Sequence, residues 1–346
     1  MAVTIIDVAR EASVSIATVS RVINRPETVK DTTRQRVQDT IDRLGYRPNP
    51  WARTLPVGQP DPVIGLVIPE IHNPVFPELA EAVEREARHH GYQVILCHTD
   101  DQWAVELNYT RLLIDRKVTG IIFVSGSFSH INGITEGYRL AEQAGIPYVF
   151  VNARTDHASS VPIIASDEVL AGKLQAEYLL TRGHRRMAFL GGSHDYYVTR
   201  DRLSGITEAM RPFPESTLVE KLGMFTASHA ARATLELFSD ADPPTGIICA
   251  SDLLALVVMR EAYSAGFVVP RDFSIIGFDG IQMGRYAIPA LTTVAQPLAQ
   301  IGRRAVRSVL GKKMTGSKKL GLTVIEGESV RTLVSAPARQ TEERSG

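Results

Sequence analysis

The apolar positions of the first sixty residues recur at helical spacing. Three segments show this pattern, at about residues 5–12, 15–24 and 32–44. Residues three and four apart lie on one face of an α-helix, so each segment predicts a short amphipathic helix. The apolar positions that define the three stripes are Val8, Ala9, Ala12, Val19, Val22, Ile23, Val37, Ile41 and Leu44. Together they predict a small all-α domain with a thin core.

Polar residues mark the ends of these helices. Thr4 followed by Asp7 resembles a capping box, and Ser15 can accept a backbone hydrogen bond at the start of the second helix. Pro26 ends that helix, because the residue before a proline disfavours helical backbone geometry. Gly45 is a suitable terminator for the third helix. The connection between the first two helices is short, which is typical of a helix-turn-helix.

After about residue 62 the pattern changes to short apolar runs that alternate with helical segments. The predicted strands are 63–68, 93–97, 120–124, 148–151, 163–165, 186–190, a run near 222, 246–250 and 273–277. The predicted helices are 76–91, 104–116, 134–145, 168–182, 200–210, one from 228 and 252–266. Such alternation specifies parallel sheets covered by helices, and it restarts at about residue 163. We therefore expect an α/β body of two doubly wound parallel-sheet lobes, with a ligand cleft at the carboxyl ends of the strands.

Composition adds a charge asymmetry to this picture. The chain of 346 residues is 44% hydrophobic and has no net charge, but its first sixty residues hold nine basic and six acidic side chains. A basic small domain on a slightly acidic body is typical of nucleic-acid-binding proteins. No apolar run reaches the roughly 18 residues of a membrane span, and the N-terminus lacks a secretory signal. We expect a soluble cytoplasmic protein with no membrane partner, in which Cys97 and Cys249 are buried core residues.

The outer face of the second predicted helix carries small, polar and cationic side chains. These are Ile16, Ala17, Ser20, Arg21 and Asn24. Such a face suits insertion into the major groove of DNA, where base edges present hydrogen-bond donors and acceptors. An ordinary solvated helix face has a similar composition, so this segment by itself leaves both interpretations open.

A marginal helix is predicted at about residues 49–56. Asn49 can cap it, and Pro50 suits its first position because a missing N–H costs nothing there. The segment is too short to be stable by itself in water. We therefore expect it to need a second copy or DNA in order to fold.

The N-terminal segment resembles a known family. The stretches VTIIDVAREASVSIATVSRVIN and LGYRPNPWARTL are similar to the head and hinge of the lactose-repressor (LacI/GalR) family of transcription regulators. The resemblance implies that the second helix contacts bases and that Leu55 of each subunit wedges into a minor-groove base step. The residues that it assigns to DNA are Thr4, Ser15, Ile16, Ala17, Thr18, Ser20, Arg21, Asn24, Asn49, Ala52, Arg53 and Leu55.

The body resembles the same family, whose bodies are similar to periplasmic sugar-binding proteins. Polar residues that follow the predicted strands are candidates for the cleft, and the resemblance implies an effector site there. Its members are Asn73, Phe76, Ser125, Asn152, Arg202, Ser251, Asp252 and Asp279. Amide, carboxylate and guanidinium groups can pair with the adjacent hydroxyls of a sugar. For Asp252 a structural role as a helix cap stays open.

Several positions depart from the family pattern, among them Ile6, which replaces a commonly aromatic or polar residue, and Pro56, which replaces a common basic residue of the hinge. Ser13 replaces the usual glycine of the turn, which predicts strain if the backbone is left-handed there. Lys30 replaces the usual capping serine before the third helix, so Asp31 is expected to cap instead. Ser251 stands where asparagine is frequent, so the identity of the ligand is not transferred from any relative.

The predicted boundaries follow from these elements. The DNA-binding head spans residues 1–58 and includes the hinge helix at about 49–56, and the body spans 62–338. Lobe 1 comprises about 62–161 and 296–323, lobe 2 comprises about 162–292 and 324–338, and residues 339–346 form a polar tail.

The sequence thus predicts a sequence-specific DNA-binding transcription regulator, a repressor, whose operator affinity is controlled by a small effector such as a sugar. We expect a homodimer on a pseudo-palindromic operator, because the tail lacks the leucine heptads of a tetramer. No cofactor, metal site or catalytic residue is predicted, since the histidines lack metal-ligand spacing and no phosphate-loop motif is present. Two alternatives use the same cleft: a sugar-binding protein and a sugar-processing enzyme.

Overall fold

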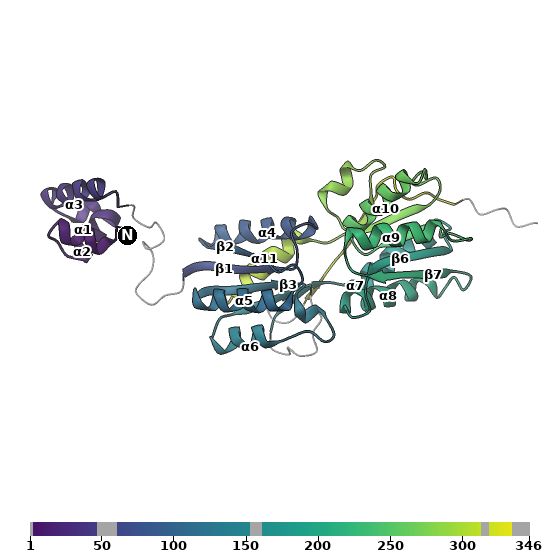
Figure 1. Cartoon of the computed structure of the whole chain (residues 1–346), viewed down its shortest axis with the longest axis horizontal. Helices are drawn as coiled ribbons and strands as arrows, with labels where there is room; N and C mark the ends of the chain where they lie inside the picture. Colours follow the sequence, from purple (N-terminus) through teal and green to yellow (C-terminus); the bar gives the residue numbers. More distant parts are fainter. Residues whose placement is uncertain (1–2, 47–60, 153–160, 313–317, 334–346) are drawn as a thin grey trace, which may run out of the picture. The chain divides into compact units, whose positions relative to one another are not determined.

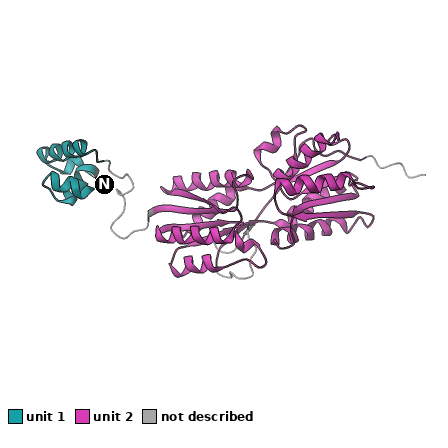
Figure 2. Ribbon diagram, viewed as in Figure 1, with its two compact units in different colours: residues 1–61 teal, residues 62–346 magenta. Residues whose placement is uncertain are grey.

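The computed structural model describes residues 3–46, 61–152, 161–312 and 318–333 (Figure 1). The contacts within the chain group into two compact units, residues 1–61 and residues 62–346 (Figure 2). The hinge segment 49–56 and the tail 339–346 lie outside the described residues.

Unit 1 is a three-helix domain. Its helices are α1 (Ile5–Glu11), α2 (Ile16–Asn24) and α3 (Asp31–Leu44), with a short 3-10 turn η1 (Pro26–Thr28) after α2. The three apolar stripes face one another and form a single small core, whose fully buried members include Val8, Val19 and Val37. The prediction of a small all-α helix-turn-helix head is confirmed.

Two of the predicted helix starts have the expected capping geometry. The Asp7 carboxylate accepts from the Thr4 backbone N–H at 2.9 Å, and the Thr4 hydroxyl accepts in return from the Asp7 N–H at 3.4 Å. The Ser15 hydroxyl accepts from the Thr18 N–H at 3.1 Å. These contacts satisfy backbone donors that have no partner within the helix.

Two local features of unit 1 differ from, or sharpen, the sequence expectations. Ser13 has φ of 53°, so the turn needs the left-handed conformation that disfavours a side chain. The expectation that Asp31 caps α3 is wrong: Lys30 is the N-cap residue, without a side-chain hydrogen bond. Asp31 is the first helical residue instead, and its carboxylate pairs with Arg34 at 2.6 Å.

Unit 2 contains two six-stranded sheets. The first has the order β11 (Lys318–Leu320), β5 (Ile163–Ser166), β4 (Tyr148–Val151), β3 (Val118–Val124), β1 (Asp61–Ile68) and β2 (Gln93–His98). The second has the order β12 (Thr323–Ile325), β10 (Thr292–Ala295), β9 (Ser274–Asp279), β8 (Gly246–Cys249), β6 (Arg186–Gly192) and β7 (Thr217–Gly223). The β10–β12 pair is antiparallel, and the other pairs described are parallel.

Helices cover the sheets in pairs (Figure 1). Those that pack on the first sheet are α4 (Val75–His89) beside α11 (Leu298–Val309), and α5 (Trp103–Asp115) beside α6 (Glu136–Gln143). Those of the second lobe are α7 (Glu168–Leu180) beside α8 (Tyr197–Met210), and α9 (Ala227–Phe238) beside α10 (Asp252–Ser264). The prediction of two doubly wound lobes is confirmed.

Both faces of the first sheet are buried. Ile64, Leu66 and Ile68 of β1 pack in the cluster that includes α4 and α11, whereas Val67 packs in the cluster of α5 and α6. Successive side chains of a strand point to opposite faces, and a parallel sheet between helices therefore needs continuous apolar runs. This explains why the strands were visible in the sequence as short unbroken apolar segments.

The chain crosses between the lobes at places that differ partly from the prediction. β5 belongs to the first sheet, so the first crossing follows Ser166, whereas the sequence analysis assigned residues from 162 to lobe 2. β10 belongs to the second sheet and α11 packs on the first lobe, so the second crossing lies near Gln296. The third lies between β11 and β12.

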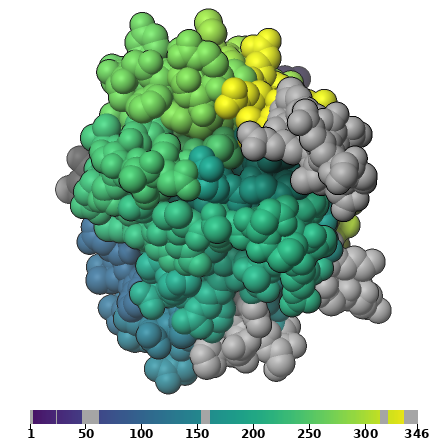
Figure 3. All heavy atoms as spheres, turned by 90° about the vertical axis from the view of Figure 1, so that its right-hand side faces the viewer, coloured from purple at the N-terminus to yellow at the C-terminus, as the bar shows by residue number. Residues whose placement is uncertain are grey.

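The C-terminal described segment packs on the second lobe. The Ile275 N–H donates to the Ser329 carbonyl at 2.8 Å, and the Leu333 N–H donates to the Arg182 carbonyl at 2.7 Å. In the space-filling view this segment is the yellow strip that adjoins the light-green surface of the second lobe (Figure 3). Cys97 and Cys249 are both buried, as predicted. Within the described ranges, no helix is long and apolar enough to cross a membrane.

Candidate functional site

The exposed face of α2 is the candidate DNA-binding surface of unit 1. Ile16 leaves 49% of its surface exposed, and Ala17 and Arg21 are exposed beside it. Val19 and Val22 point the other way, into the core. The helix therefore has the division between a packed face and a free face that its sequence predicts.

Of the polar residues that the resemblance assigns to DNA, Thr4, Ser15 and Thr18 lie at the starts of α1 and α2. The Thr4 hydroxyl donates to Asp7 at 2.6 Å, and the Ser15 and Thr18 hydroxyls lie 2.9 Å apart. Ser20 is half-buried on α2, and Asn24 is the last residue of that helix. The remaining predicted DNA contacts, Asn49, Ala52, Arg53 and Leu55, lie outside the described residues.

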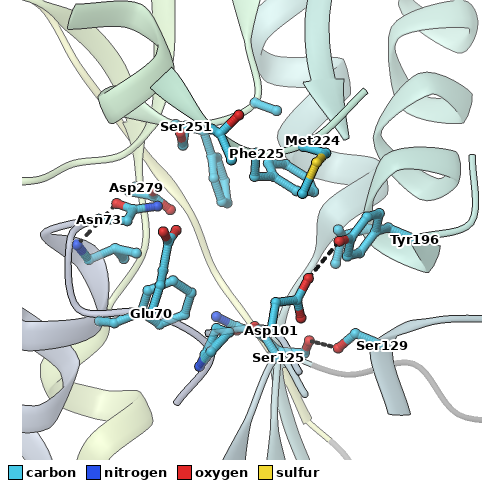
Figure 4. A pocket seen from close by; sticks show the side chains of 18 of the residues that line it. Glu70, Asn73, Asp101, Ser125, Ser129, Tyr196, Met224, Phe225, Ser251 and Asp279 are labelled. Atoms are coloured by element: carbon cyan, nitrogen blue, oxygen red, sulfur yellow. Dashed lines mark hydrogen bonds between the residues drawn. The ribbon is translucent and has the colours of Figure 1, made fainter. Parts of the chain in front are cut away.

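A cavity of about 220 Å³ lies between the two lobes of unit 2 (Figure 4). Seven of the eight predicted effector residues line it: Asn73, Phe76, Ser125, Asn152, Arg202, Ser251 and Asp279. They come from the carboxyl ends of strands in both sheets and from α4 and α8. The rule that ligand sites form at the carboxyl ends of parallel strands therefore holds for both lobes.

The ends of several strands at the cavity, β2 with Asp100 and Asp101 among them, have unusual backbone geometry. Ser125, Asn152 and Asp279 have φ of 44°, 53° and 115°. Residues with side chains rarely adopt positive φ, and such residues concentrate at functional sites because the surrounding structure must hold them there. Here the turn after each strand directs a polar side chain toward the cavity instead of along the sheet.

Arg202 lines the cavity, and each of its three guanidinium nitrogens has a partner in the wall. Its Nε donates to Glu168 Oε2 at 3.1 Å, its Nη2 donates to the same oxygen, and its Nη1 donates to the Ala250 carbonyl at 2.5 Å. The guanidinium carbon also lies 3.9 Å from the centre of the Phe278 ring. Arg202 is 4% exposed, so this arrangement is a buried ion pair built into the wall of the cavity.

Asp252 is the predicted effector residue that does not line the cavity. Its carboxylate accepts from the Gly280 and Ile281 N–H groups at 2.8 Å each and from the Thr293 hydroxyl at 2.5 Å. It does not cap α10 either, because the cap is Ser251, whose hydroxyl accepts from the Leu254 N–H at 3.3 Å. Burial raises the pKa of Asp252 to about 7. Asp252 holds the turn after β9 and so positions the neighbouring Asp279.

Asp279 is held in place by Gln296, which lies where the chain crosses between the lobes. Gln296 Nε2 donates to Asp279 Oδ1 at 2.7 Å, and the Ser166 hydroxyl donates to Gln296 Oε1 at 2.9 Å. Burial, followed by the nearby Asp252 charge, raises the pKa of Asp279 well above its ordinary value. A carboxyl group in this state accepts and donates hydrogen bonds, which suits the hydroxyl groups of a small ligand.

Sequence reasoning missed several residues that line the cavity. They are Pro69, Glu70, Val75, Asp100, Asp101, Ser129, Glu168, Tyr196, Val198, Met224, Phe225, Thr226, Ala250, Phe278 and Gln296. Glu70 and the pair Asp100–Asp101 follow β1 and β2, so the strand-end rule that found Asn73 could have found them. Glu168 and Gln296 lie where the chain crosses between lobes, and no local pattern marks such positions.

The two lobes also touch at the rim of the cavity. The Tyr196 hydroxyl donates to Asp101 Oδ2 at 2.8 Å, and the rings of His130 and Tyr196 lie 4.0 Å apart. Beside them the Ile131 N–H donates to the Asp195 carbonyl at 2.9 Å. On another part of the boundary, the Gln282 N–H of η4 (Gln282–Tyr286) donates to Glu78 of α4 at 2.9 Å.

The described residues contain no group of three or more His, Cys, Asp or Glu side chains arranged to hold a metal ion. The cavity instead combines aromatic walls with carboxylate, amide and hydroxyl groups. This combination is typical of a binding site for a small polar organic molecule.

Two sequence profiles match the chain. That of bacterial regulatory proteins of the lacI family matches residues 4–49, and that of a periplasmic binding protein-like domain matches residues 176–330. Catabolite control protein A from Priestia megaterium is 36% identical over 312 residues, which are 89% of this chain and 91% of that protein.

Solved structures have the same architecture. A LacI family transcriptional regulator from Enterococcus faecium with bound ribose gives a TM-score of 0.70 at 26% identity, over 79% of this chain and 100% of that one. The lac repressor dimer bound to operator and the anti-inducer ONPF gives a TM-score of 0.77 at 24% identity, over 96% of this chain and 100% of that one. The helix-turn-helix head, the two-lobed body and these matches together establish that the chain belongs to the lacI family of bacterial transcription regulators.

Proposed function

We propose that this protein is a cytoplasmic repressor that binds a pseudo-palindromic operator as a homodimer and changes its operator affinity when a small metabolite occupies the cavity between its lobes. The observation that carries the proposal is the presence, in one chain, of an exposed α2 face and of a polar cavity at the strand ends of both lobes. The α2 face is the proposed DNA-binding element, and the cavity is the proposed ligand sensor.

On the DNA side, α2 enters the major groove. Arg21 is exposed and cationic, and it can donate two hydrogen bonds to a guanine edge, while Ile16 and Ala17 offer apolar contact to a thymine methyl group. Thr4, Ser15, Thr18, Ser20 and Asn24 contact phosphates and fix the position of the helix.

The hinge completes this proposal. Asn49 begins a short helix that carries Ala52, Arg53 and Leu55, and two such helices lie together in the minor groove. Leu55 unstacks the central base step and bends the DNA. Because one such helix is unstable alone, its formation depends on how close the two subunits stand, and this distance is what the effector controls.

On the ligand side, the effector is a sugar or a related small metabolite. The cavity of about 220 Å³ is below the range typical of drug-sized ligands, and its polar lining comes from many separate strand ends. The ribose-bound relative supports a ligand of this size.

Exposed apolar side chains support self-association. Met283, Tyr286 and Ile288 lie on and just after η4 and are 55%, 72% and 96% exposed. Large apolar side chains that gather on one exposed segment mark an interaction surface in many proteins. A second copy of this chain is the occupant that the proposed operator symmetry requires.

The test is a selection of operators from random duplex DNA with the full-length protein, followed by fluorescence anisotropy at moderate salt. We expect enrichment of a two-fold symmetric site, and a change in affinity for it when a metabolite that binds the body is added. If no palindrome is preferred over random duplex, with or without metabolites, the proposal is wrong. Chemical turnover of a bound sugar would favour a sugar-processing enzyme instead, and ligand binding without any DNA preference would favour a sugar-binding protein.

A further inference from the structure

The cavity between the lobes has an unusual charge balance. Five carboxyl groups line it, from Glu70, Asp100, Asp101, Glu168 and Asp279, and Arg202 is the one lysine or arginine among the lining residues that the structure describes. A neutral sugar site needs hydrogen-bonding groups of both kinds but no such excess of one charge. Because Glu168 is paired with Arg202 and burial disfavours ionisation of Asp279, the carboxyl groups left for a counter-charge are Glu70, Asp100 and Asp101.

The positive charge of Arg202 is already paired with a carboxylate of the wall. Two of its nitrogens already donate to Glu168, and the third donates to the Ala250 carbonyl. Arg202 and Glu168 therefore neutralise each other inside the wall. The cavity has no remaining cation for an anionic ligand, and the other carboxyl groups would repel one.

Glu70 is the carboxylate placed to meet a ligand. It follows β1, and its side chain extends into the middle of the cavity (Figure 4). Partial burial raises its pKa, and the charges of Asp101 and Asp100 raise it further, whereas His72 and a hydrogen bond from Asn73 act in the opposite direction. The desolvation of Glu70 is therefore offset only in part, by the His72 charge and the Asn73 hydrogen bond, and no ion pair between described residues includes Glu70.

Two further features of the wall suit a ligand that is both cationic and hydroxylated. Phe76, Tyr196 and Phe225 also line the cavity, and the face of an aromatic ring attracts an ammonium group in a desolvated site. Asn152 Oδ1 is buried at the cavity without a hydrogen-bond partner among the described residues, so it is an acceptor ready for a hydroxyl group.

We propose that the effector is a protonated amine that also carries hydroxyl groups, such as an amino sugar, with its ammonium group against Glu70. This inference rests on the proposed function, since it names the class of molecule that the same cavity senses. Binding of a neutral sugar would remove water from the carboxylates and leave them without a counter-charge. An ammonium group offsets that loss and keeps Glu70 ionised.

The first test compares cationic probes with matched neutral ones on the full-length protein. Isothermal titration calorimetry and thermal shift are run with D-glucosamine, D-galactosamine and D-mannosamine, each against its N-acetyl derivative and its parent hexose. Ethanolamine and tris(hydroxymethyl)aminomethane are run against ethylene glycol and pentaerythritol as smaller probes. We expect at least one amine to bind at least tenfold more tightly than both of its neutral partners, and its binding to strengthen between pH 5 and pH 7, where the carboxyl groups ionise while the amine stays protonated.

The variant Glu70→Gln tests the residue. We expect it to lower amine affinity at least tenfold and to remove most of the pH dependence of binding. It also provides a readout without ligand. Because the pKa of Glu70 is raised in the folded state, this group costs stability as the pH rises above its unfolded value, so E70Q should raise the melting temperature at pH 8 and not at pH 4. The control is Glu81→Gln, which removes an exposed carboxylate of α4 that pairs with Arg85.

Failure of this inference is distinguishable from failure of the proposed function. If no amine in either set exceeds its neutral partners, or if E70Q leaves amine affinity unchanged, the cationic effector is wrong. A neutral hexose that alters operator affinity would overturn it while supporting a sugar-sensing repressor. Loss of the function itself would be seen separately, as the absence of any preferred operator in the same preparations.

Discussion

The outer face of α2 and the wall of the cavity are the two proposed recognition surfaces, and they are built in opposite ways. On α2 the recognising side chains are exposed and make few contacts, while different residues of the same helix hold the fold. In the cavity the recognising groups are themselves part of the packing, as Arg202 and Asp279 show. Specificity on α2 is therefore separable from stability, whereas in the cavity the two are coupled.

Arg202→Ala is the change with the largest expected effect on stability. It leaves the Glu168 carboxylate buried without its partner, and breaking a buried pair in this way costs about 3–5 kcal/mol. The measurement is the free energy of unfolding in urea. The control is Arg200→Ala two residues earlier, where the exposed side chain donates to the His194 carbonyl and a loss under about 0.5 kcal/mol is expected. Equal losses of unfolding free energy in both variants would contradict the coupling between recognition and stability in the cavity.

Asp252→Asn is expected to cost about 1–3 kcal/mol, because an amide cannot accept all three of the hydrogen bonds that the carboxylate accepts. It should also change the pH dependence. The pKa of Asp252 is raised to about 7, so its contribution to stability is complete at low pH and is lost as the pH rises through 7. Melting temperatures between pH 5 and pH 9 should fall less steeply in D252N than in the wild type. The buried Asp279 should leave a residual slope.

Arg21→Ala tests the α2 face, where specificity is expected to be separable from stability. We expect operator affinity to fall by about 1–3 kcal/mol, with sequence preference relaxed at one base pair of each half-site. The unfolding free energy of the head should change by less than about 0.5 kcal/mol. The matched control is Arg10→Ala on α1, which removes the same charge from an exposed position with one weak partner, Asp7. If both variants lose equal affinity for all sequences, Arg21 contributes charge and not base recognition.

Ser13→Gly has the smallest expected effect. A left-handed backbone costs a residue with a side chain about 1–2 kcal/mol, and glycine removes this strain. Part of the resulting gain in stability is lost because glycine has greater conformational freedom in the unfolded chain. We expect the head to gain less than about 1 kcal/mol, measured by thermal unfolding. A lower stability would show that the Ser13 side chain contributes a contact that offsets the strain.

The sequence predicted the elements of the fold well because local rules govern them. Helix caps such as Ser15 and buried strands such as β1 each have a signal within a few neighbouring residues. The short strands β11 and β12 have no such signal, because three residues cannot show a period and their pairing depends on distant strands. The misplaced first crossing has the same cause, since the assignment of β5 to a sheet depends on its partner β4.

The candidate site was predictable only in part, for a related reason. The strand-end rule identifies where ligand groups gather, and it placed Asn73 and Asp279 correctly on the cavity. It does not tell which of two adjacent polar residues turns inward, so Asp252 was included although only Ser251 lines the cavity. The pairing of Arg202 with Glu168 brings together residues 34 positions apart, and no local pattern in the sequence marks this contact.

The contact between Tyr196 and Asp101 has a consequence for the rate at which a signal is received. Because this hydrogen bond ties the two lobes together at the rim, a metabolite that enters by that side must wait until the bond opens. Entry and release on that side then depend on the same contact, which is made by two residues that also line the cavity. A substitution at either residue is therefore expected to change the speed of the response together with the choice of ligand.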